Sequence, residues 1–394
     1  MNAPTRAIPV AKPLLDEREV EAARRVILSG WVTQGPEVAK FEQEFAAFVG
    51  APHACAVSNC TTALHLALLA IGVQPGDEII TVSHSFIATA NAIRYCGAVP
   101  VFVDIEADGF NIDPGQLAEA ITPRTRAILC VHQLGMPCDL RAIVSFGREH
   151  GIPVIEDAAC ASGSEILWDG QWDKIGKPHG DIACFSFHPR KVVTTGDGGM
   201  LTTANPAYDR QFRLLRQHAM NVADTVRHGS RQVIFESYDE VGYNYRMTDL
   251  QAAIGRVQLE RLPEIVATRR RLAALYGELL RPIKGLQAPV EPSWARSNWQ
   301  SYCVTLPAGV DQVDIMQALL DRGISTRRGV MNSHLEQAYQ GPGMYRAIGG
   351  LERSAAAQAN SIMLPLYVQM SEDDVRYVAS ELASALTRVI EPAA

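Results

Sequence analysis

The sequence predicts an α/β protein with a large, mostly parallel sheet flanked by helices and a smaller C-terminal α/β domain. Between about residues 37 and 260, short runs rich in β-branched residues alternate with helical stretches, an order typical of βαβ units. After a Pro-rich break at Leu286–Pro292, a second and shorter set of such runs follows. We therefore divide the chain into an N-terminal segment (1–36), a large domain (37–262) and a small domain (263–394).

The strands and helices of the large domain are expected in regular alternation. Because parallel strands need crossover connections, this order favours a parallel sheet, with ligands bound at the carboxyl ends of its strands. The expected strands are His53–Ser58, Glu78–Val82, Val99–Asp104, Ala127–Val131, Pro153–Glu156, Ile182–Phe187 and Gly199–Thr203. The expected helices are Thr61–Ile71, Phe86–Tyr95, Gln116–Ile121 and Leu140–Glu149.

A long helical stretch, about Thr248–Leu280, carries the chain out of the large domain. We expect Pro263 to interrupt it, because proline lacks an N–H and clashes with the preceding turn. In the small domain, Tyr302–Leu306 predicts a strand and Val313–Arg322 a helix. The last helix presents an apolar face made of Val375, Val378, Leu382 and Leu386.

Composition excludes several classes of protein. The 394 residues carry a net charge of -7, which argues against a nucleic-acid or membrane-surface partner. The first residues lack the apolar core of a signal peptide, and no apolar run reaches the roughly 20 residues of a spanning helix. Eight cysteines are scattered without CxxC or zinc-type spacing, so we expect a reducing, cytoplasmic setting with no disulfide framework and no metal site.

The run ValIleGluAspAla at 154–158 is typical of a buried strand, and it contains two acids, Glu156 and Asp157. A carboxylate at the carboxyl end of a strand can face a cofactor pocket. Opposite a heterocyclic nitrogen it would hold that nitrogen protonated, which makes the ring an electron sink. A helix cap or a loop acid is the alternative interpretation.

A lysine stands between an expected strand and a glycine-rich segment. The run CysPheSerPheHisProArgLys at 184–191 places Ser186 on the strand and ends in Lys191, and ThrThrGlyAspGlyGly at 194–199 follows. Because burial disfavours the ammonium form, we expect Lys191 to have a lowered pKa and to act as a nucleophilic amine. The glycines would let the backbone approach a flat cofactor closely. A surface lysine beside a flexible loop is the alternative.

Small polar residues open an expected helix in SerAsnCysThrThrAlaLeuHisLeuAla at 58–67. Free N–H groups and the helix dipole can bind a phosphate at such a start, and Thr61 and Thr62 can add hydroxyl donors. An ordinary N-cap is the alternative. The sequence contains no Walker P-loop or GxGxxG fingerprint here.

The order of these motifs is more specific than any one of them: a phosphate turn, then a carboxylate on a strand, then a lysine before glycines. In this order the sequence resembles the DegT/DnrJ/StrS-type sugar aminotransferases, which depend on pyridoxal 5'-phosphate (PLP) and have fold type I. The resemblance covers about Ile8 to Val378. Its landmarks are SerGlyTrpValThrGlnGlyPro (29–36), the run 58–67, SerPheIleAlaThrAlaAsnAla (85–92), GluAspAlaAla (156–159), SerPheHisProArgLys (186–191) and ValGlyTyrAsnTyrArgMetThrAspLeuGlnAlaAla (241–253).

The resemblance implies a role for each residue that contacts PLP. Lys191 matches the lysine that carries PLP as a Schiff base and moves the proton between Cα and C4′. Asp157 matches the acid that pairs with the pyridine nitrogen, and Ser186 and Thr61 match the residues that bind the phosphate. Phe86 matches the aromatic residue that stacks on the ring, although on the residues alone a core Phe would be the favoured interpretation.

The resemblance also implies a homodimer with shared active sites, because Asn244 matches an asparagine that reaches the phosphate of the neighbouring subunit's cofactor. Arg327 and His334 match an Arg and a His near the substrate site, where an Arg could bind a diphosphate or a donor carboxylate. A solvated Arg and a structural His are the alternatives.

The sequence departs from the family pattern in four places. Cys60 stands where a glycine is usual, which is expected to alter the phosphate turn slightly. Cys160 replaces the usual Gln or His that contacts the phenolic oxygen of the cofactor, and a thiol is a weaker donor. Both cysteines are expected beside the cofactor. The run 165–179 is longer than in most members, and we expect a substrate-facing loop there. ArgGlnHisAla at 216–219 varies the usual ArgAsnHisGly.

We therefore predict a PLP-dependent transaminase that moves an amino group from L-glutamate to a nucleotide-diphosphate keto-sugar, with a 4-keto-6-deoxyhexose as the favoured substrate. A 3-keto-sugar or keto-cyclitol substrate is an alternative. So is a non-catalytic PLP-fold regulatory protein, against which Lys191 and Asp157 argue. Lys191 also argues against the sugar 3-dehydrase branch, which has His there. A desulfurase is disfavoured because Cys60 and Cys160 are not expected on a mobile loop over the substrate.

Overall fold

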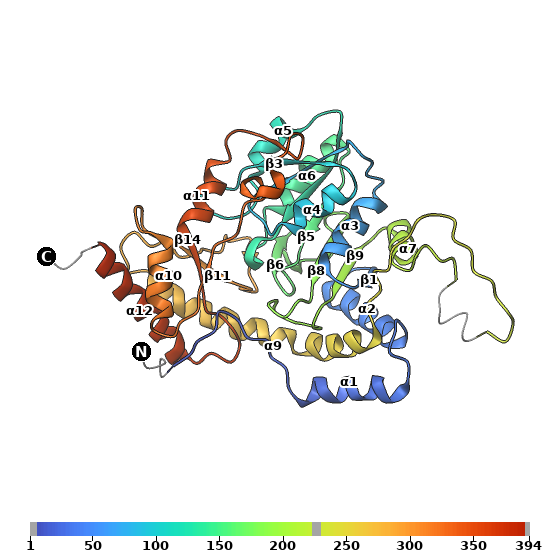
Figure 1. The fold of residues 1–394 in the computed structure, drawn as a ribbon, viewed down its shortest axis with the longest axis horizontal. Helices are drawn as coiled ribbons and strands as arrows, with labels where there is room; N and C mark the ends of the chain where they lie inside the picture. Colours follow the sequence, from blue (N-terminus) through green and yellow to red (C-terminus); the bar gives the residue numbers. More distant parts are fainter. Residues whose placement is uncertain (1–5, 223–229, 391–394) are drawn as a thin grey trace.

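The computed structural model describes residues 6–222 and 230–390 and has the predicted α/β architecture, with helices on both sides of a large sheet (Figure 1). Among these residues the sheet has eight strands in the order β1-β9-β8-β5-β4-β2-β3-β13. β9 pairs antiparallel with β1 and β8, and every other neighbouring pair is parallel, so the predicted mostly parallel sheet is confirmed. The strands are β1 (His53–Val57), β2 (Glu78–Val82), β3 (Val99–Val103), β4 (Thr125–Val131), β5 (Val154–Asp157), β8 (Ile182–Ser186), β9 (Gly199–Thr203) and β13 (Arg346–Ala347).

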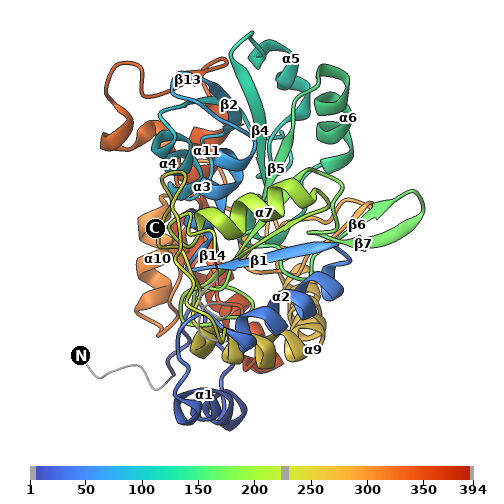
Figure 2. The same cartoon turned by 90° about the vertical axis from the view of Figure 1, so that its right-hand side faces the viewer.

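Helices cover the central strands on both faces, which agrees with the burial of every residue of β5 and β8. Figure 2 shows α3 (Cys60–Ala70) and α7 (Pro206–Leu215) on one side of β1, and α2 (Pro36–Val49) with α9 (Asp249–Leu280) on the other. α3 packs across β8 and β9, where the active-site motifs begin. The other helices of this domain are α4 (Ala88–Tyr95), α5 (Leu117–Ala120) and α6 (Leu140–His150).

The predicted interruption of the long helix at Pro263 is wrong, because α9 continues through the proline. A proline inside a helix costs about 3 kcal/mol relative to alanine. Here Leu262 and Ile265 are fully buried, and α1 (Glu17–Ser29) and α12 (Glu372–Ile390) pack along the helix. Burial of this apolar stripe offsets the cost of the proline.

The small domain has a hydrophobic core of its own. The core of the large domain reaches along α9 to Val266, and the second core begins at Leu272 and includes Ile8. The apolar face predicted for the last helix lies in this second core. Its elements are β11 (Tyr302–Thr305), β12 (Arg327–Arg328) and β14 (Ser361–Leu364), which form an antiparallel sheet, and α10 (Gln312–Leu320), α11 (Glu352–Asn360) and α12.

We keep the division after residue 262 as a proposal, supported by the two cores. The small-domain part of the chain also returns to the large sheet, where Arg346 and Ala347 of β13 pair with β3. The outer ends of the first and third predicted segments, residues 1–5 and 391–394, lie outside the described residues.

The run 165–179 forms a paired hairpin rather than the expected loop. β6 (Glu165–Trp168) pairs with β7 (Gln171–Lys174), and β10 (Ala295–Arg296) adds a third strand. Asp169 and Gly170 both have positive φ, 48° and 80°, as a two-residue hairpin turn requires. The hairpin projects from the side of the large domain (Figure 2), and its substrate-facing role stays a prediction.

Candidate active site

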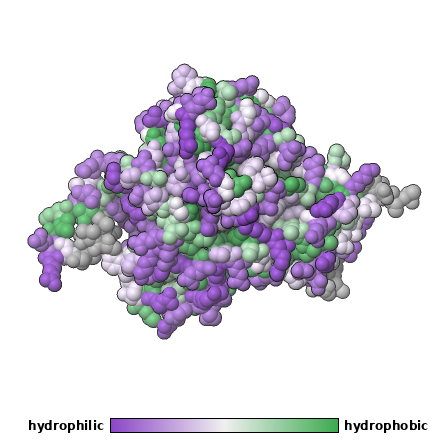
Figure 3. All heavy atoms as spheres, turned by 180° about the vertical axis from the view of Figure 1, so that it is seen from behind, coloured by the Kyte–Doolittle hydropathy of each residue, from purple (hydrophilic) through white to green (hydrophobic). Residues whose placement is uncertain are grey.

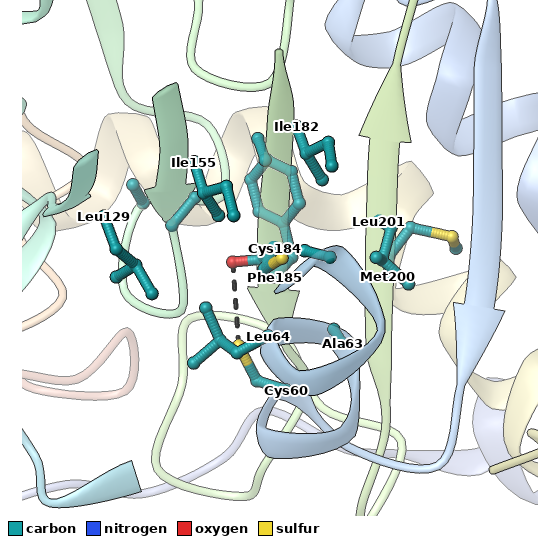
Figure 4. Packing of buried hydrophobic residues seen from close by; sticks show 14 of the residues in the cluster. Cys60, Ala63, Leu64, Leu129, Ile155, Ile182, Cys184, Phe185, Met200 and Leu201 are labelled. Atoms are coloured by element: carbon teal, nitrogen blue, oxygen red, sulfur yellow. Dashed lines mark hydrogen bonds between the residues drawn. The ribbon is translucent and has the colours of Figure 1, made fainter. Parts of the chain in front are cut away.

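The carboxyl ends of β5 and β8 meet the start of α3 at one edge of the large sheet. Asp157 is the last residue of β5 and Ser186 the last of the parallel neighbour β8. The Cys60 thiol, at the start of α3, donates to the main-chain oxygen of Cys184 on β8 over 3.6 Å (Figure 4). Gly199 permits this approach, because a Cβ there would lie 2.5 Å from the main chain that begins α3. The three sequence motifs therefore come together in space.

The start of α3 has donors available for an anion. Asn59 caps the helix, accepting from the Thr62 N–H at 2.9 Å. The N–H groups of Cys60 and Thr61 have no acceptor among the residues that the structure describes. The Cys60 side chain is 8% exposed and faces the core (Figure 4), so a phosphate contact of Cys60 would come from its N–H. Such a helix start binds phosphate through free N–H groups and the dipole.

Asp157 is a buried carboxylate held by two neutral donors. Its Oδ2 accepts from the Thr89 hydroxyl at 2.8 Å, and its Oδ1 accepts from the Ala159 N–H at 3.1 Å. Burial raises the pKa of Asp157 above its ordinary value, and the Thr89 and Ala159 hydrogen bonds partly oppose this. Each oxygen keeps a further lone pair, so the carboxylate can still accept from a cationic N–H.

The Lys191 amine points at Cys160, and the Nζ–Sγ distance is 3.0 Å. Burial lowers the pKa of Lys191, but Cys160, Cys60 and Asp157 together raise it more, so the pKa lies above its ordinary value. The lowered pKa expected from burial alone is therefore wrong, because the acidic neighbours outweigh desolvation. The amine must lose a proton before it can act as a nucleophile.

Two of the three glycines after Lys191 permit close packing within the protein. A Cβ on Gly198 would lie 2.3 Å from the Thr195 hydroxyl, and one on Gly199 would meet the start of α3. Gly196 has a φ of 84° and open space around it. At Gly198 and Gly199 the close approach is therefore to the protein itself, and the predicted approach of the backbone to a flat cofactor stays a prediction.

The other predicted site residues differ in their exposure and in their contacts. Phe86 precedes α4 and is 64% exposed, which excludes the core interpretation. The Ser83 hydroxyl lies 2.6 Å from His334 Nδ1, and burial lowers the pKa of His334. Arg327 on β12 and Asn244 are exposed. Among the described residues, neither makes a hydrogen bond or an ion pair with Asp157 or Lys191.

Sequence reasoning missed the hydroxyl groups of the connection between β2 and α4 and of the first turn of α4. Thr89 bonds to Asp157, Ser85 lies 2.8 Å from Thr89, and Ser83 contacts His334. Ser85 and Thr89 lie within the landmark run 85–92 and are four residues apart. Because Ser85 lies before α4, which begins at Ala88, the four-residue spacing of a helical turn does not account for this contact, and the sequence carries no plain signal for the pair.

An anion site, a carboxylate with spare acceptor capacity and the amine of a half-buried lysine fit a phosphate-bearing carbonyl cofactor such as PLP. Within the described ranges, no three His, Cys, Asp or Glu side chains are grouped to hold a metal ion. No helix in residues 6–222 and 230–390 has the length and apolarity to cross a membrane.

Comparisons with known proteins agree with this chemistry. The model of the DegT/DnrJ/EryC1/StrS aminotransferase family matches residues 13–383. The chain is 39% identical over 372 residues to the spore coat polysaccharide biosynthesis protein SpsC of Bacillus subtilis, covering 93% of this chain and 94% of that protein.

Two solved structures extend this likeness to the fold. Spr1654 from Streptococcus pneumoniae, solved in its PMP form, has a TM-score of 0.89 at 26% identity, covering 97% of this chain and 100% of that one. DesI, solved in the presence of its TDP-sugar product, has a TM-score of 0.85 at 30% identity, covering 98% and 94%.

Proposed function

The chain belongs to the DegT/DnrJ/EryC1/StrS aminotransferase family, and from this premise we propose that it transfers an amino group from L-glutamate to a nucleotide-diphosphate keto-sugar. Membership makes it a PLP-dependent transaminase of the sugar aminotransferase type. The observation that carries the proposed mechanism is the meeting of Lys191, Asp157 and the start of α3 at one edge of the sheet.

Bound PLP supplies an aldehyde that exchanges amino groups and a ring that delocalises the electron pair left when a proton is removed. The α3 N–H groups, Thr61 and Ser186 would hold its phosphate. Asp157 would hold its pyridine nitrogen protonated, a charge-assisted contact that a buried carboxylate makes strong. Cys160, beside the Lys191 amine, would contact its phenolic oxygen, and Phe86 would cover its ring.

In this proposal Lys191 is the residue that transfers protons. As a free amine it removes the proton from Cα of the amino donor and delivers it to C4′, and it reverses these transfers for the keto-sugar. Its raised pKa makes it a strong base once deprotonated. The Cys160 sulfur, 3.0 Å from Nζ, would keep the amine oriented when no cofactor is attached to it.

The substrate must be held by placed donors, since a chain of net charge -7 offers no general positive field to a diphosphate. We assign this to Arg327 and His334. The relative DesI was solved with a TDP-sugar product, which supports a nucleotide sugar here. We favour amination at C4 of a 4-keto-6-deoxyhexose, and a 3-keto-sugar or a keto-cyclitol is the alternative.

We also propose a homodimer in which Asn244 serves the cofactor of the neighbouring subunit. The segment that leads to it carries exposed apolar side chains, and Val233, Phe235 and Val241 are 84%, 89% and 83% exposed. Figure 3 shows a hydrophobic patch on the projecting end of the molecule. Such an unpartnered apolar surface is typical of a subunit contact.

We further propose a cytoplasmic location. All eight cysteines are free thiols, although Cys60 and Cys184 lie close together. Free thiols in this number suit a reducing compartment.

Absorbance spectroscopy of the purified holoenzyme tests the proposed reaction. Glutamate should bleach the yellow band of the bound cofactor and release 2-oxoglutarate, and a nucleotide 4-keto-6-deoxyhexose should restore the band in a ping-pong pattern. Recovery with 3-keto-sugars alone would move the amination to C3. Recovery with a free keto-cyclitol and no nucleotide sugar would refute the substrate class.

A further inference from the structure

A line of buried hydroxyl groups leads from the β2–α4 connection to Asp157. The Ser85 hydroxyl lies 2.8 Å from the Thr89 hydroxyl, which in turn lies 2.8 Å from Asp157 Oδ2. Ser85, Thr89 and Asp157 are 3%, 2% and 5% exposed. Water therefore has little access to replace either contact.

The direction of these hydrogen bonds follows from the chemistry of the groups. An ionised carboxylate only accepts, so the single hydroxyl proton of Thr89 goes to Asp157. The Thr89 oxygen can then only accept, and its donor is Ser85. Both hydroxyl protons thus point toward the carboxylate and stabilise its charged form.

We propose that Thr89, supported by Ser85, is the positioning residue of Asp157: it holds the carboxylate ionised and in the orientation that faces the pyridine nitrogen of the cofactor. With the Ala159 N–H on the other oxygen, the two donors fix the rotation of the carboxylate about its last bond. This inference rests on the proposed function, in which Asp157 binds that nitrogen.

The charge balance around Asp157 shows why it needs these donors. Lys191 and His132 act on it as positive or potentially positive groups, and the buried thiols of Cys60 and Cys184 lie near it. Burial raises the pKa of Asp157, and the Thr89 hydrogen bond is the largest opposing influence. Loss of the Thr89 hydroxyl should raise that pKa further, and a protonated acid cannot hold a proton on the ring nitrogen.

A matched pair of substitutions separates positioning from packing. Thr89→Val removes the hydroxyl and keeps the shape. Thr81→Val is its control, because Thr81 lies on the adjoining strand β2, is 0% exposed, and its hydroxyl has no partner among the described residues. Thr89→Ser restores a hydroxyl and should rescue the contact. Ser85→Ala removes only the supporting donor.

The test measures PLP binding to the full-length apo-protein by fluorescence between pH 5 and 9. Wild-type affinity should fall as the pH drops through the pKa of Asp157. Thr89→Val should bind PLP about tenfold more weakly, the loss expected for a hydrogen bond to a charged group, with the midpoint moved to higher pH. Ser85→Ala should weaken PLP binding by roughly threefold or less. It should also move the midpoint of the pH dependence to higher pH, by less than Thr89→Val does. Thr81→Val should match wild type.

Equal affinity and midpoint in Thr89→Val and Thr81→Val would overturn the inference. If Thr89→Val does not fold, an unchanged midpoint in Ser85→Ala overturns it instead. Asp157→Asn separates failure of this inference from failure of the proposed function. If Asp157→Asn leaves the PLP affinity and its pH dependence unchanged, Asp157 does not bind the ring nitrogen, and the role proposed for Thr89 fails together with the role proposed for Asp157.

Discussion

The two ends of the active site are built in different ways. At the cofactor end, Asp157, Lys191 and Cys160 are joined to each other or to the main chain at the carboxyl edge of the large sheet. At the substrate end, Arg327 is exposed on β12 of the small domain, and His334 lies in the same part of the chain with its ring nitrogen against the Ser83 hydroxyl. Short motifs within one domain thus determine the reaction type, whereas the residues assigned to specificity come from elsewhere. Substitutions at the cofactor end should slow the reaction with every substrate, and substitutions at the substrate end should affect the reaction with one substrate only.

The largest effect should come from Lys191→Ala. Removing the amine takes away both the covalent attachment of the cofactor and the proton-transfer group, so turnover should fall at least about a thousandfold. Stopped-flow absorbance should show the same loss with glutamate and with the keto-sugar. Lys177→Ala, which removes an amine that pairs with Asp173 on the hairpin, is the control. Retention of a tenth of the activity would exclude Lys191 as the base.

The pH dependence of the free energy of unfolding tests the β2–α4 connection, which joins the cofactor end to the substrate end. His84 lies in the sequence between Ser83, which contacts His334, and Ser85. Burial lowers the pKa of His84 from 6.5 to about 4, and Asn332 and Asp104 oppose this shift in part. The unfolded chain therefore binds a proton that the folded protein does not. The free energy of unfolding should fall by about 3 kcal/mol as the pH drops from about 6.5 to 4.

Urea unfolding at a series of pH values measures this loss, and His84→Gln should flatten the slope over that window. The same slope in wild type and His84→Gln would show that other groups cause the loss.

Much of the fold could be predicted because the buried strands consist mostly of apolar or β-branched residues. Glu78–Val82 and Gly199–Thr203 are strands with the predicted bounds. The continuation of α9 through Pro263 could not be predicted, because it depends on packing against helices far away in the sequence. β13 has two residues that pair with β3, too few to show a periodic pattern. The Asp169–Gly170 pair, in contrast, is a recognisable hairpin signal within the run 165–179.

The site could be predicted where its residues follow strand ends. Asp157 and Ser186 end neighbouring parallel strands, so their proximity follows from the topology. The Thr89–Asp157 contact joins residues 68 positions apart, and side-chain direction in α4 decides it. The raised pKa of Lys191 depends on the balance between burial, which lowers it, and Cys160, Cys60 and Asp157, which raise it; the motifs predict that these groups are neighbours but not which influence is larger.

A smaller effect, confined to one substrate, is expected for Arg327→Ala. Loss of a guanidinium that binds the diphosphate should raise KM for the nucleotide sugar about tenfold and leave the glutamate half-reaction unchanged. Steady-state kinetics in both half-reactions measure this. Arg328→Ala is the control, because Arg328 is the neighbouring residue and pairs with Glu336 at 3.6 Å. An equal effect of the two substitutions would remove Arg327 from the substrate site.

The smallest effect concerns sharing of sites between subunits. In heterodimers of Lys191→Ala and Asn244→Ala protomers, one site carries both lesions and the other carries none, so about half of the wild-type activity should return. Assays of heterodimers purified with two different tags measure it. Inactive heterodimers would show that Asn244 acts within its own subunit.

Borohydride reduction of the holoenzyme, followed by peptide mass spectrometry, tests the central assignment most directly. Reduction should fix the cofactor covalently on the peptide that contains Lys191, with loss of the yellow band. The other lysines, Lys12, Lys40, Lys174, Lys177 and Lys284, should carry no added mass. Cofactor found on one of those lysines, or on none, would contradict the account.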